Sequence, residues 1–373
     1  MSIQPDLKEL LGGGLRAPIC LTWELTYACN LACTHCLSSS GRRDPRELDT
    51  AACIRFIDEL AAMGVFYVNI GGGEPTSRAD FEEIVAYALS RRVGIKYSTN
   101  GLRMSDDMIA MLAANDYLDL QISLDGPNPS SNDPIRGEGT FERVLGTLER
   151  LHRARVEGYK ISTVVTRRSL PELDDLLSLA TGFGATLRLT RLRPSGRGAL
   201  SWEALRLQPE QQRILHQWLL SHPEVLTGDS YFHLNAFGAA LPGLNMCGAG
   251  RVVCLVDPIG TVYACPFTIA EEFAAGTLST SSFQQIWNES PLFAQLRHQP
   301  GPTSCTSCAA YAACQGGCMA QKYFTGLSYD DPDPECVFGH GSEVLSKVTT
   351  PRAPDLSHSV VRFGPRRSAT SAH

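Results

Sequence analysis

Three cysteines lie within ten residues near the start of the chain. In YACNLACTHC, Cys29, Cys33 and Cys36 are separated by three and then by two residues. A structural zinc site closes with four ligands, and a [4Fe–4S] cube needs one ligand for each iron. Three thiolates in one short loop therefore leave one metal position open, for water on zinc or for a small chelating ligand on a cube. A zinc knuckle completed by a distant ligand, such as His35, is the alternative.

Eight further cysteines fall between residues 247 and 336, and two fully coordinated cubes need eight ligands. CxxC pairs also build zinc ribbons, so two zinc sites are the alternative. The remaining pair, Cys20 and Cys53, lies in apolar surroundings and is interpreted as buried packing. The eight are Cys247, Cys254, Cys265, Cys305, Cys308, Cys314, Cys318 and Cys336.

The composition indicates a globular protein, and we expect it in the cytoplasm. The chain has 373 residues and a formal net charge of −6, which argues against a nucleic-acid binder. No apolar run approaches the roughly 18 residues of a membrane span, and the N-terminal residues lack the pattern of a secretory signal. Disulfides are rare in the cytoplasm, so the clustered thiols point to metal binding or catalysis.

Strand-like and helix-like segments alternate from Cys20 to Leu192, which predicts a parallel sheet with right-handed crossovers. Six units fall short of the eight of a closed barrel, so we expect an α/β fold with a partial (β/α)6 barrel, open on one side to a large substrate. The segment 209–220 predicts a further helix. The expected organisation is an N-terminal segment (1–17), the barrel (18–200), a bridge (201–244), a small cysteine-rich domain (245–340) and a disordered tail (341–373).

The unusual residues directly follow predicted strands. In β/α barrels the chemistry lies at the carboxyl ends of the strands, so these residues are expected to meet at one face. They are the three-cysteine loop, GGGEP (71–75), TNG (99–101), SLDG (123–126) and RPSGRG (193–198).

A Cys-x3-Cys-x2-Cys loop after the first strand, with GGGEP after the second, resembles the radical S-adenosylmethionine (SAM) superfamily. The resemblance implies that SAM chelates the open iron of a cube and is cleaved to a 5′-deoxyadenosyl radical that abstracts hydrogen. It places His35 near the adenine and offers the Glu74 carboxylate to the SAM ammonium group. Gly72 and Gly73, which lack side chains, let the backbone approach the ligand closely.

Three more residues are candidates for SAM binding. Ser123 and Asp125 could reach the SAM carboxylate or the ribose hydroxyls, and simple capping of the strand end is the alternative. Arg136, in DPIRG, is a candidate partner of the SAM carboxylate, or a solvated surface arginine.

The later cysteines resemble the SPASM domain, the C-terminal module of radical SAM enzymes that modify peptides and proteins. The resemblance implies two auxiliary [4Fe–4S] clusters with interleaved ligands, and hence three clusters in all. Full ligation by cysteine would leave the auxiliary clusters the task of electron transfer. Cluster I would use Cys247, Cys254, Cys265 and Cys318, and cluster II would use Cys305, Cys308, Cys314 and Cys336.

The proton acceptor is less clearly marked. Sulfatase-maturating relatives usually carry an acid directly after the cysteine that aligns with Cys265, and here that residue is Pro266. Asp229 and Asp257 are the nearest alternatives, and the sequence does not choose between them.

Residues 17 to 340 also resemble the mycofactocin radical SAM maturases, in stretches such as APICLTWELTYACNLACTHCLSSSG, LRPSGRG and LNMCGAGRVVCLVDPIG. This implies a peptide substrate that ends in Val-Tyr. The tyrosine is oxidatively decarboxylated, and a carbon–carbon cross-link to the preceding valine follows. No peptide-recognition domain fits in residues 1 to 16, which suggests a separate peptide-binding chaperone. A reductant such as flavodoxin or ferredoxin is expected as a further partner.

Two features suit such a peptide. Four arginines crowd the last strand and its loop, where a guanidinium could hold a terminal carboxylate, although a solvated basic edge is the alternative. Tyr231 and Phe232, with His233, could line a pocket for tyrosine or serve as ordinary core. The rival hypotheses are a maturase of another peptide or of a sulfatase, and a zinc-binding interaction module. The arginines are Arg188, Arg191, Arg193 and Arg197.

Overall fold

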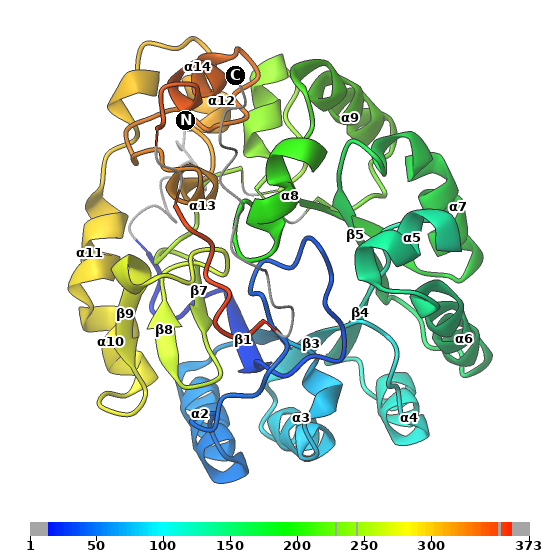
Figure 1. Ribbon diagram of the computed structural model, residues 1–373. Helices are drawn as coiled ribbons and strands as arrows, with labels where there is room; N and C mark the ends of the chain where they lie inside the picture. Colours follow the sequence, from blue (N-terminus) through cyan, green and yellow to red (C-terminus); the bar gives the residue numbers. More distant parts are fainter. Residues whose placement is uncertain (1–13, 228–229, 244, 350–351, 360–373) are drawn as a thin grey trace, which may run out of the picture.

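A nine-stranded sheet forms the centre of the computed structural model, which describes residues 14–227, 230–243, 245–349 and 352–359. The strand order is β6-β5-β4-β3-β2-β1-β7-β8-β9. The first six strands are parallel and follow one another in chain order, which confirms the partial (β/α)6 barrel (Figure 1). They are β1 (Cys20–Thr26), β2 (Tyr67–Gly72), β3 (Gly94–Thr99), β4 (Leu118–Ser123), β5 (Lys160–Val165) and β6 (Thr186–Arg191).

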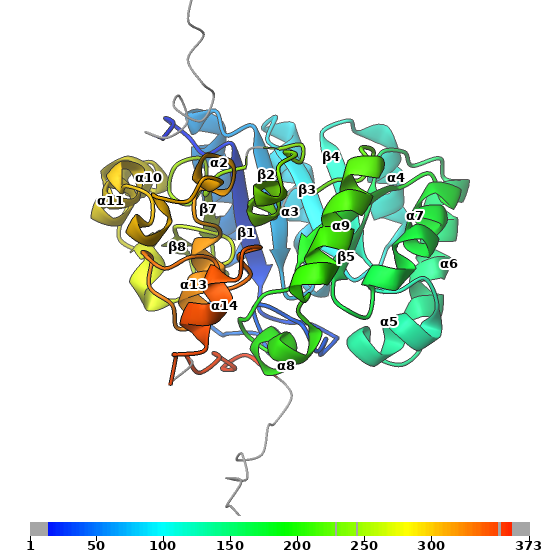
Figure 2. The same ribbon diagram turned by 90° about the horizontal axis from the view of Figure 1, so that it is seen from above.

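Helices cover the outer face of the barrel, as Figures 1 and 2 show. Their ends follow local sequence signals. In helix α2 (Thr50–Met63), the Asp49 carboxylate caps the start by accepting a hydrogen bond from Ala52 N at 2.8 Å. Gly64 ends the helix in a left-handed conformation with φ 70°. The outer helices are α2 (Thr50–Met63), α3 (Phe81–Ser90), α4 (Asp106–Ala114), α6 (Thr140–Arg153) and α7 (Leu173–Gly182).

Three more helices lie near the rim. The predicted helix at 209–220 is confirmed as α9 (Pro209–Ser221). Two short helices that the sequence analysis missed are α5 (Pro129–Arg136) and α8 (Gly198–Leu205). Both follow turn-rich segments and have an interior proline or a leading glycine, so their sequences resemble loops.

The alternation of side chains along β1 separates the core from the interior of the barrel. Leu21, Trp23 and Leu25 are buried in the hydrophobic core, and Trp23 meets Phe56 of α2 edge to face at 5.0 Å. The intervening residues face the inside of the barrel. The inner face is polar rather than filled with aliphatic side chains, which leaves a cavity where a closed barrel would have a packed centre.

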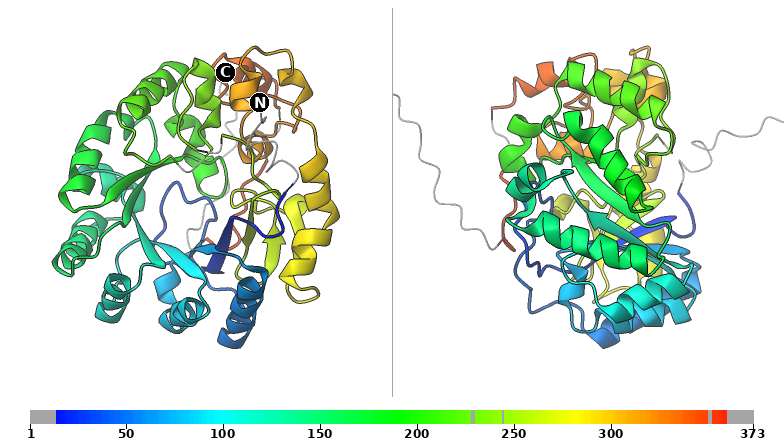
Figure 3. Two further views of the ribbon diagram at one scale, coloured as in Figure 1. Left: turned by 180° about the vertical axis from the view of Figure 1, so that it is seen from behind. Right: turned by 90° about the vertical axis from the view of Figure 1, so that its right-hand side faces the viewer.

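The cysteine-rich region continues the same sheet. Strand β7 (Val253–Val256) pairs in parallel with β1, and β8 (Thr261–Tyr263) and β9 (Ala274–Thr277) follow antiparallel. Figure 3 shows this region closing one side of the arc of strands. Its helices are α10 (Phe283–Glu289), α11 (Pro291–His298), α12 (Tyr311–Cys314), α13 (Met319–Phe324) and α14 (His340–Leu345).

The prediction of disorder from residue 341 is wrong for the described part of the tail. The first residues of this segment belong to α14. Further on, His358 stacks on Tyr27 with ring centroids 3.8 Å apart, and its carbonyl accepts from Arg42 N at 2.9 Å. Composition missed this because the docking depends on a partner more than 300 residues away in sequence. Within the described chain, no helix is both long and apolar enough to cross a lipid bilayer.

Candidate active site

A cavity of about 590 Å³ opens on the inner face of the sheet. The cysteine loop after β1 and side chains from all six barrel strands line it. Three cysteines of the second group, Cys247, Cys265 and Cys318, line the same cavity. The structure therefore brings the N-terminal cysteines and three cysteines of the second group to one internal space, although they are more than 200 residues apart in sequence.

Backbone contacts join the GGGEP turn to the cysteine loop. Gly73 N donates to Thr26 O, and Glu74 N donates to Ala28 O, each at 2.7 Å. A Cβ on Gly73 would lie 2.0 Å from Ala28 O, so no larger residue fits there. The glycines thus allow the two strand ends to pack closely, in addition to the expected approach to a ligand.

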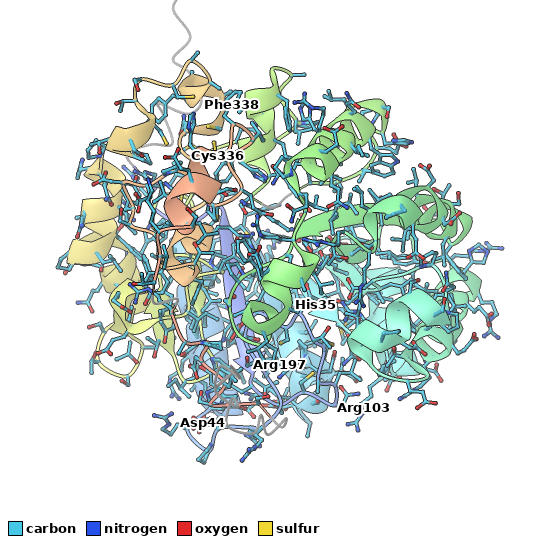
Figure 4. The ribbon with its side chains drawn as sticks, turned by 45° about the horizontal axis from the view of Figure 1, so that its top comes forward. His35, Asp44, Arg103, Arg197, Cys336 and Phe338 are labelled. Atoms are coloured by element: carbon cyan, nitrogen blue, oxygen red, sulfur yellow. The ribbon has the colours of Figure 1, made fainter. Side chains whose placement is uncertain are left out.

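The RPSGRG segment (193–198) also contacts the cysteine loop through hydrogen bonds to its backbone carbonyls. Arg197 Nε donates to Cys33 O at 2.9 Å, and its Nη1 donates to Ser40 O at 3.0 Å. A Cβ on Gly196 would lie 2.5 Å from Leu37 O. Figure 4 shows His35 and Arg197 close to the centre of the molecule, with Cys336 well apart from both.

Glu74 lies at the cavity wall with its carboxylate already engaged. Oε1 accepts from the hydroxyls of Thr76 and Thr99 at 2.8 and 2.7 Å, and Oε2 accepts from Asn100 N at 2.7 Å. The carboxylate thus links the ends of β2 and β3. Burial nevertheless raises its pKa, so a cation such as an ammonium group would be favourable beside it.

Asp125 joins two of the predicted SAM contacts. Its Oδ2 lies 2.6 Å from His35 Nε2 and 2.7 Å from Arg136 Nε, and Oδ1 accepts from Val164 N at 2.8 Å. Burial opposes ionisation, but Arg136 and then His35 hold the pKa of Asp125 well below its usual range. His35, Arg136 and Ser123 line the cavity, whereas Asp125 does not. The expectation that Asp125 itself reaches SAM is therefore corrected, because its carboxylate binds and positions His35 and Arg136 instead.

Replacing Asp125 by asparagine is expected to destabilise the cluster-free protein by about 3–5 kcal/mol at pH 7, because Arg136 is left buried without its counter-charge. A carboxylate whose folded pKa is depressed stabilises the fold above its unfolded pKa of about 3.9, and this stabilisation is lost as the pH falls through the folded value. The difference in the free energy of unfolding between the unmodified and the Asp125→Asn proteins should therefore narrow as the pH falls below about 4.

Denaturant unfolding at a series of pH values measures this gap. Asp106→Asn is the matched control, because Asp106 also pairs with an arginine but its side chain is 95% exposed. A gap of the same size at pH 7 and at acid pH would contradict the assignment of Asp125 as the ionised partner.

The thiols of Cys247, Cys265 and Cys318 form one set. Burial raises the pKa of Cys265 and of Cys247, and their nearest thiol neighbours are one another and Cys318. Cys254 is not brought to this set. It pairs in register with Leu21, whereas Val253 pairs with cavity-lining Cys20, so the Cys254 side chain points into the core.

The other four cysteines of the second group form a separate set. The pKa of Cys314 is raised by burial and then by the neighbouring thiols of Cys336, Cys305 and Cys308. Lys322 lies between the two sets, and its charge is close to Cys305, Cys247 and Cys318. A buried cation there offsets the negative charge that thiolate ligands would bring.

These sets fit clusters better than single ions. No group of three His, Cys, Asp or Glu side chains in the described ranges is close enough to hold one metal ion. A cube spreads its ligands over separate irons, so its thiolates lie farther apart than those on one zinc ion. Burial also raises the pKa of Cys29 to about 12, and a bound metal would lower the pKa of such a thiol.

Arg191, Arg193 and Arg197, which were proposed to hold a carboxylate, contact other groups of the chain. Arg191 forms ion pairs with Asp333 and Glu335, each at 2.6 Å, and Arg197 braces the cysteine loop. Arg193 Nη1 lies 3.3 Å from Cys318 Sγ, and its guanidinium is stacked 3.8 Å over Phe267.

Arg188 lines the cavity together with Lys96, which the sequence analysis missed. Burial, and then Arg188, lower the pKa of Lys96 to about 8. These two side chains give the sheet face of the cavity a cationic region that suits an anionic group.

The structure describes one of the two predicted proton acceptors. Asp229 lies outside the described residues. Asp257 is buried and accepts from Tyr27 Oη and Thr261 N, and it does not line the cavity. Glu24, on the inner face of β1, does line the cavity, and burial, with a smaller effect of Asp257, raises its pKa to about 8. Its position two and four residues after inward-facing Thr22 and Cys20 was the signal that could have found it.

The proposed aromatic pocket is present in part. Tyr231 and Phe232 are buried at the cavity wall. His233 points elsewhere, and burial followed by Arg191 lowers its pKa to about 3, so it is neutral.

Comparison with known proteins supports this geometry. Residues 23–180 match the model of the radical SAM superfamily, and residues 247–309 match that of an iron–sulfur cluster-binding domain, SPASM. The structure of SuiB from Streptococcus suis bound to precursor peptide SuiA superposes with a TM-score of 0.73, at 18% identity over 88% of this chain and 78% of that chain. Fold and site thus define a radical SAM enzyme with SAM and iron–sulfur chemistry, and not a zinc-binding interaction module.

Two curated relatives are much closer in sequence. The chain is 57% identical to mycofactocin maturase MftC of Mycolicibacterium smegmatis, over 95% of this chain and 92% of the relative. It is 56% identical to the protein of the same name from Mycobacterium tuberculosis, over 95% and 92%. The chain belongs to the mycofactocin maturase family.

Proposed function

We propose that the enzyme modifies the C-terminal Val-Tyr of a small mycofactocin precursor peptide. It first decarboxylates the tyrosine oxidatively and then forms a carbon–carbon cross-link between that tyrosine and the preceding valine. Family membership over 95% of the chain is the observation that carries this proposal. The shared cavity, which joins the N-terminal thiols to three thiols of the second group, supports it because an oxidation needs an electron acceptor near the substrate.

Three [4Fe–4S] clusters are assigned to the three thiol sets. Cys29, Cys33 and Cys36 hold the SAM-binding cluster, while Gly72, Gly73, Glu74, Ser123, His35 and Arg136 hold SAM, with Asp125 behind the last two. When bound, SAM and its cluster would supply a 5′-deoxyadenosyl radical for removal of a hydrogen atom from the tyrosine β-carbon. The auxiliary clusters would supply the acceptor for the electron released with CO₂.

The cavity wall provides the contacts for the peptide. Lys96 and Arg188 attract its terminal carboxylate, and Tyr231 and Phe232 pack against its aromatic ring. Glu24 replaces Asp257 as our candidate proton acceptor beside Asp229, because its raised pKa suits proton transfer near neutral pH. A separate chaperone presents the precursor, and a flavodoxin or ferredoxin supplies electrons.

The test is mass spectrometry of the peptide after anaerobic incubation with SAM, a reductant and the chaperone. A precursor ending in Val-Tyr should lose the mass of formic acid, since CO₂ and two hydrogens leave the tyrosine. The same peptide ending in Val-Phe is the control for recognition of the phenol. An unchanged Val-Tyr peptide, with a sulfatase cysteine oxidised instead, would contradict the proposal in favour of a sulfatase maturase.

A further inference from the structure

The auxiliary thiol set at the cavity has three members, and the eighth cysteine of the second group lies elsewhere. Cys247, Cys265 and Cys318 line the cavity, whereas Cys254 is fully buried in the hydrophobic core. The pleat of the sheet separates them. Because β7 residues alternate between faces, Val253 shares the cavity face with Cys20, and Cys254 shares the opposite face with Leu21.

The surroundings of Cys254 agree with this placement. After burial, the influences on its pKa are Cys20 on the adjacent strand, then Arg297 on α11, and last Cys265. Arg297 is fixed there by donating to Gly250 O and Trp287 O at 2.7 and 2.8 Å. To reach the cavity, Cys254 would need a one-residue shift of β7, which would turn Val253 and Leu255 to the wrong faces.

The cavity next to this set is cationic. Val253 packs against the turn that begins at Cys247. A Cβ added to Gly248 in this turn would lie 3.4–3.6 Å from the methyl carbons of Val253. Across β1, the thiol of Cys20 is under the influence of Lys96 and Arg188. Arg193, beside Cys318, adds a third positive side chain. An anion is therefore the favoured guest at this end of the cavity.

We infer that Cys247, Cys265 and Cys318 form a three-thiolate auxiliary site whose uncapped iron faces the cavity and binds the C-terminal carboxylate of the peptide. This inference rests on the proposed function, and it revises the expectation that both auxiliary clusters are closed by four cysteines. A carboxylate held there would have its electron acceptor as a direct neighbour when CO₂ leaves. Cys254 is a core residue in this scheme, equivalent in role to Cys53 of α2.

The first test is iron and sulfide content in a background in which Cys29, Cys33 and Cys36 are all alanine. This background should hold about eight irons in two auxiliary cubes. Adding Cys254→Ala should leave about eight, as should the matched core control Cys53→Ala, whereas Cys265→Ala should leave about four. Retention of about four irons in the Cys254→Ala protein would overturn the inference. The same loss in Cys20→Ala would also overturn it, since the site would then be closed by Cys20.

The second test needs no variant at Cys254 and so does not depend on how that variant folds. Electron–nuclear double resonance is recorded on the reduced background protein with a Val-Tyr precursor whose terminal carboxylate carries ¹⁷O. Coupling of ¹⁷O to an auxiliary cluster is expected, and it should vanish with a peptide amide. Absence of coupling would overturn the inference. The mass of the peptide is measured in parallel with the unmodified enzyme. This separates failure of the inferred carboxylate site from failure of the proposed function, because only the latter would leave the precursor mass unchanged.

Discussion

Replacement of Cys33 by alanine is expected to abolish SAM cleavage and to lower the iron content from about twelve to about eight per chain. Cys33 lies in the middle of the three-thiol loop, beside Cys36 and Arg136. The loop itself should survive the change, since Arg197 holds the Cys33 carbonyl and Glu74 N holds Ala28 O. The protein should therefore fold and keep both auxiliary sets.

Release of methionine and 5′-deoxyadenosine from SAM, with iron and sulfide analysis, measures this effect. Cys53→Ala is the control, because it also removes a single thiol, but one that lies in α2 within the apolar core and away from the cavity. Methionine release by the Cys33→Ala protein at the rate of the control would show that the three thiols do not form the SAM site.

Replacement of Arg191 by alanine is expected to destabilise the protein by about 3–5 kcal/mol. Arg191 lies at the end of β6, and its guanidinium forms buried ion pairs with Asp333 and Glu335. Burial opposes ionisation of Asp333, but Arg191 holds the pKa of that carboxylate well below its usual range, while burial raises the pKa of Glu335. Without the arginine, both carboxylates would remain buried without the cation that pairs with them.

The Arg191→Ala change should also disturb the two auxiliary thiol sets. Asp333 Oδ2 accepts from Cys318 N at 2.8 Å, and Cys336 follows three residues after Asp333. The midpoint of thermal unfolding and the iron content should fall together, with the SAM-binding set retained. Arg91→Ala is the control, because the Arg91–Asp58 pair is about half exposed and contributes about 0–1 kcal/mol. Equal midpoints for the two variants would contradict the role assigned to Arg191.

The fold and the cysteine sets follow from sequence because they depend on local order. Alternating strands and helices imply consecutive parallel pairing, and unusual residues after the strands imply a common face. The positions of Cys29, Cys33 and Cys36 around one loop follow from spacing alone. The same is true of the grouping of Cys305, Cys308 and Cys314, which the structure keeps together.

The remaining parts of the site depend on pairing between distant segments. A register of β7 against β1 decides which of two adjacent residues, Val253 or Cys254, faces the cavity, and no local pattern reveals it. Arg191 looked like a ligand for an anion because its carboxylate partners lie more than 140 residues later. Asp125 looked like a ligand for SAM because its pairing with His35, 90 residues earlier, and with Arg136 could not be read from the sequence.

The account depends most on one open iron in the N-terminal loop that SAM occupies. Electron–nuclear double resonance of the reduced full-length protein tests this directly, with SAM labelled by ¹⁵N in its amino group and ¹⁷O in its carboxylate. Coupling of both labels to a cluster is predicted, together with its loss in the Cys33→Ala protein. A cluster spectrum that stays unchanged on addition of SAM, with no methionine released, would contradict the account.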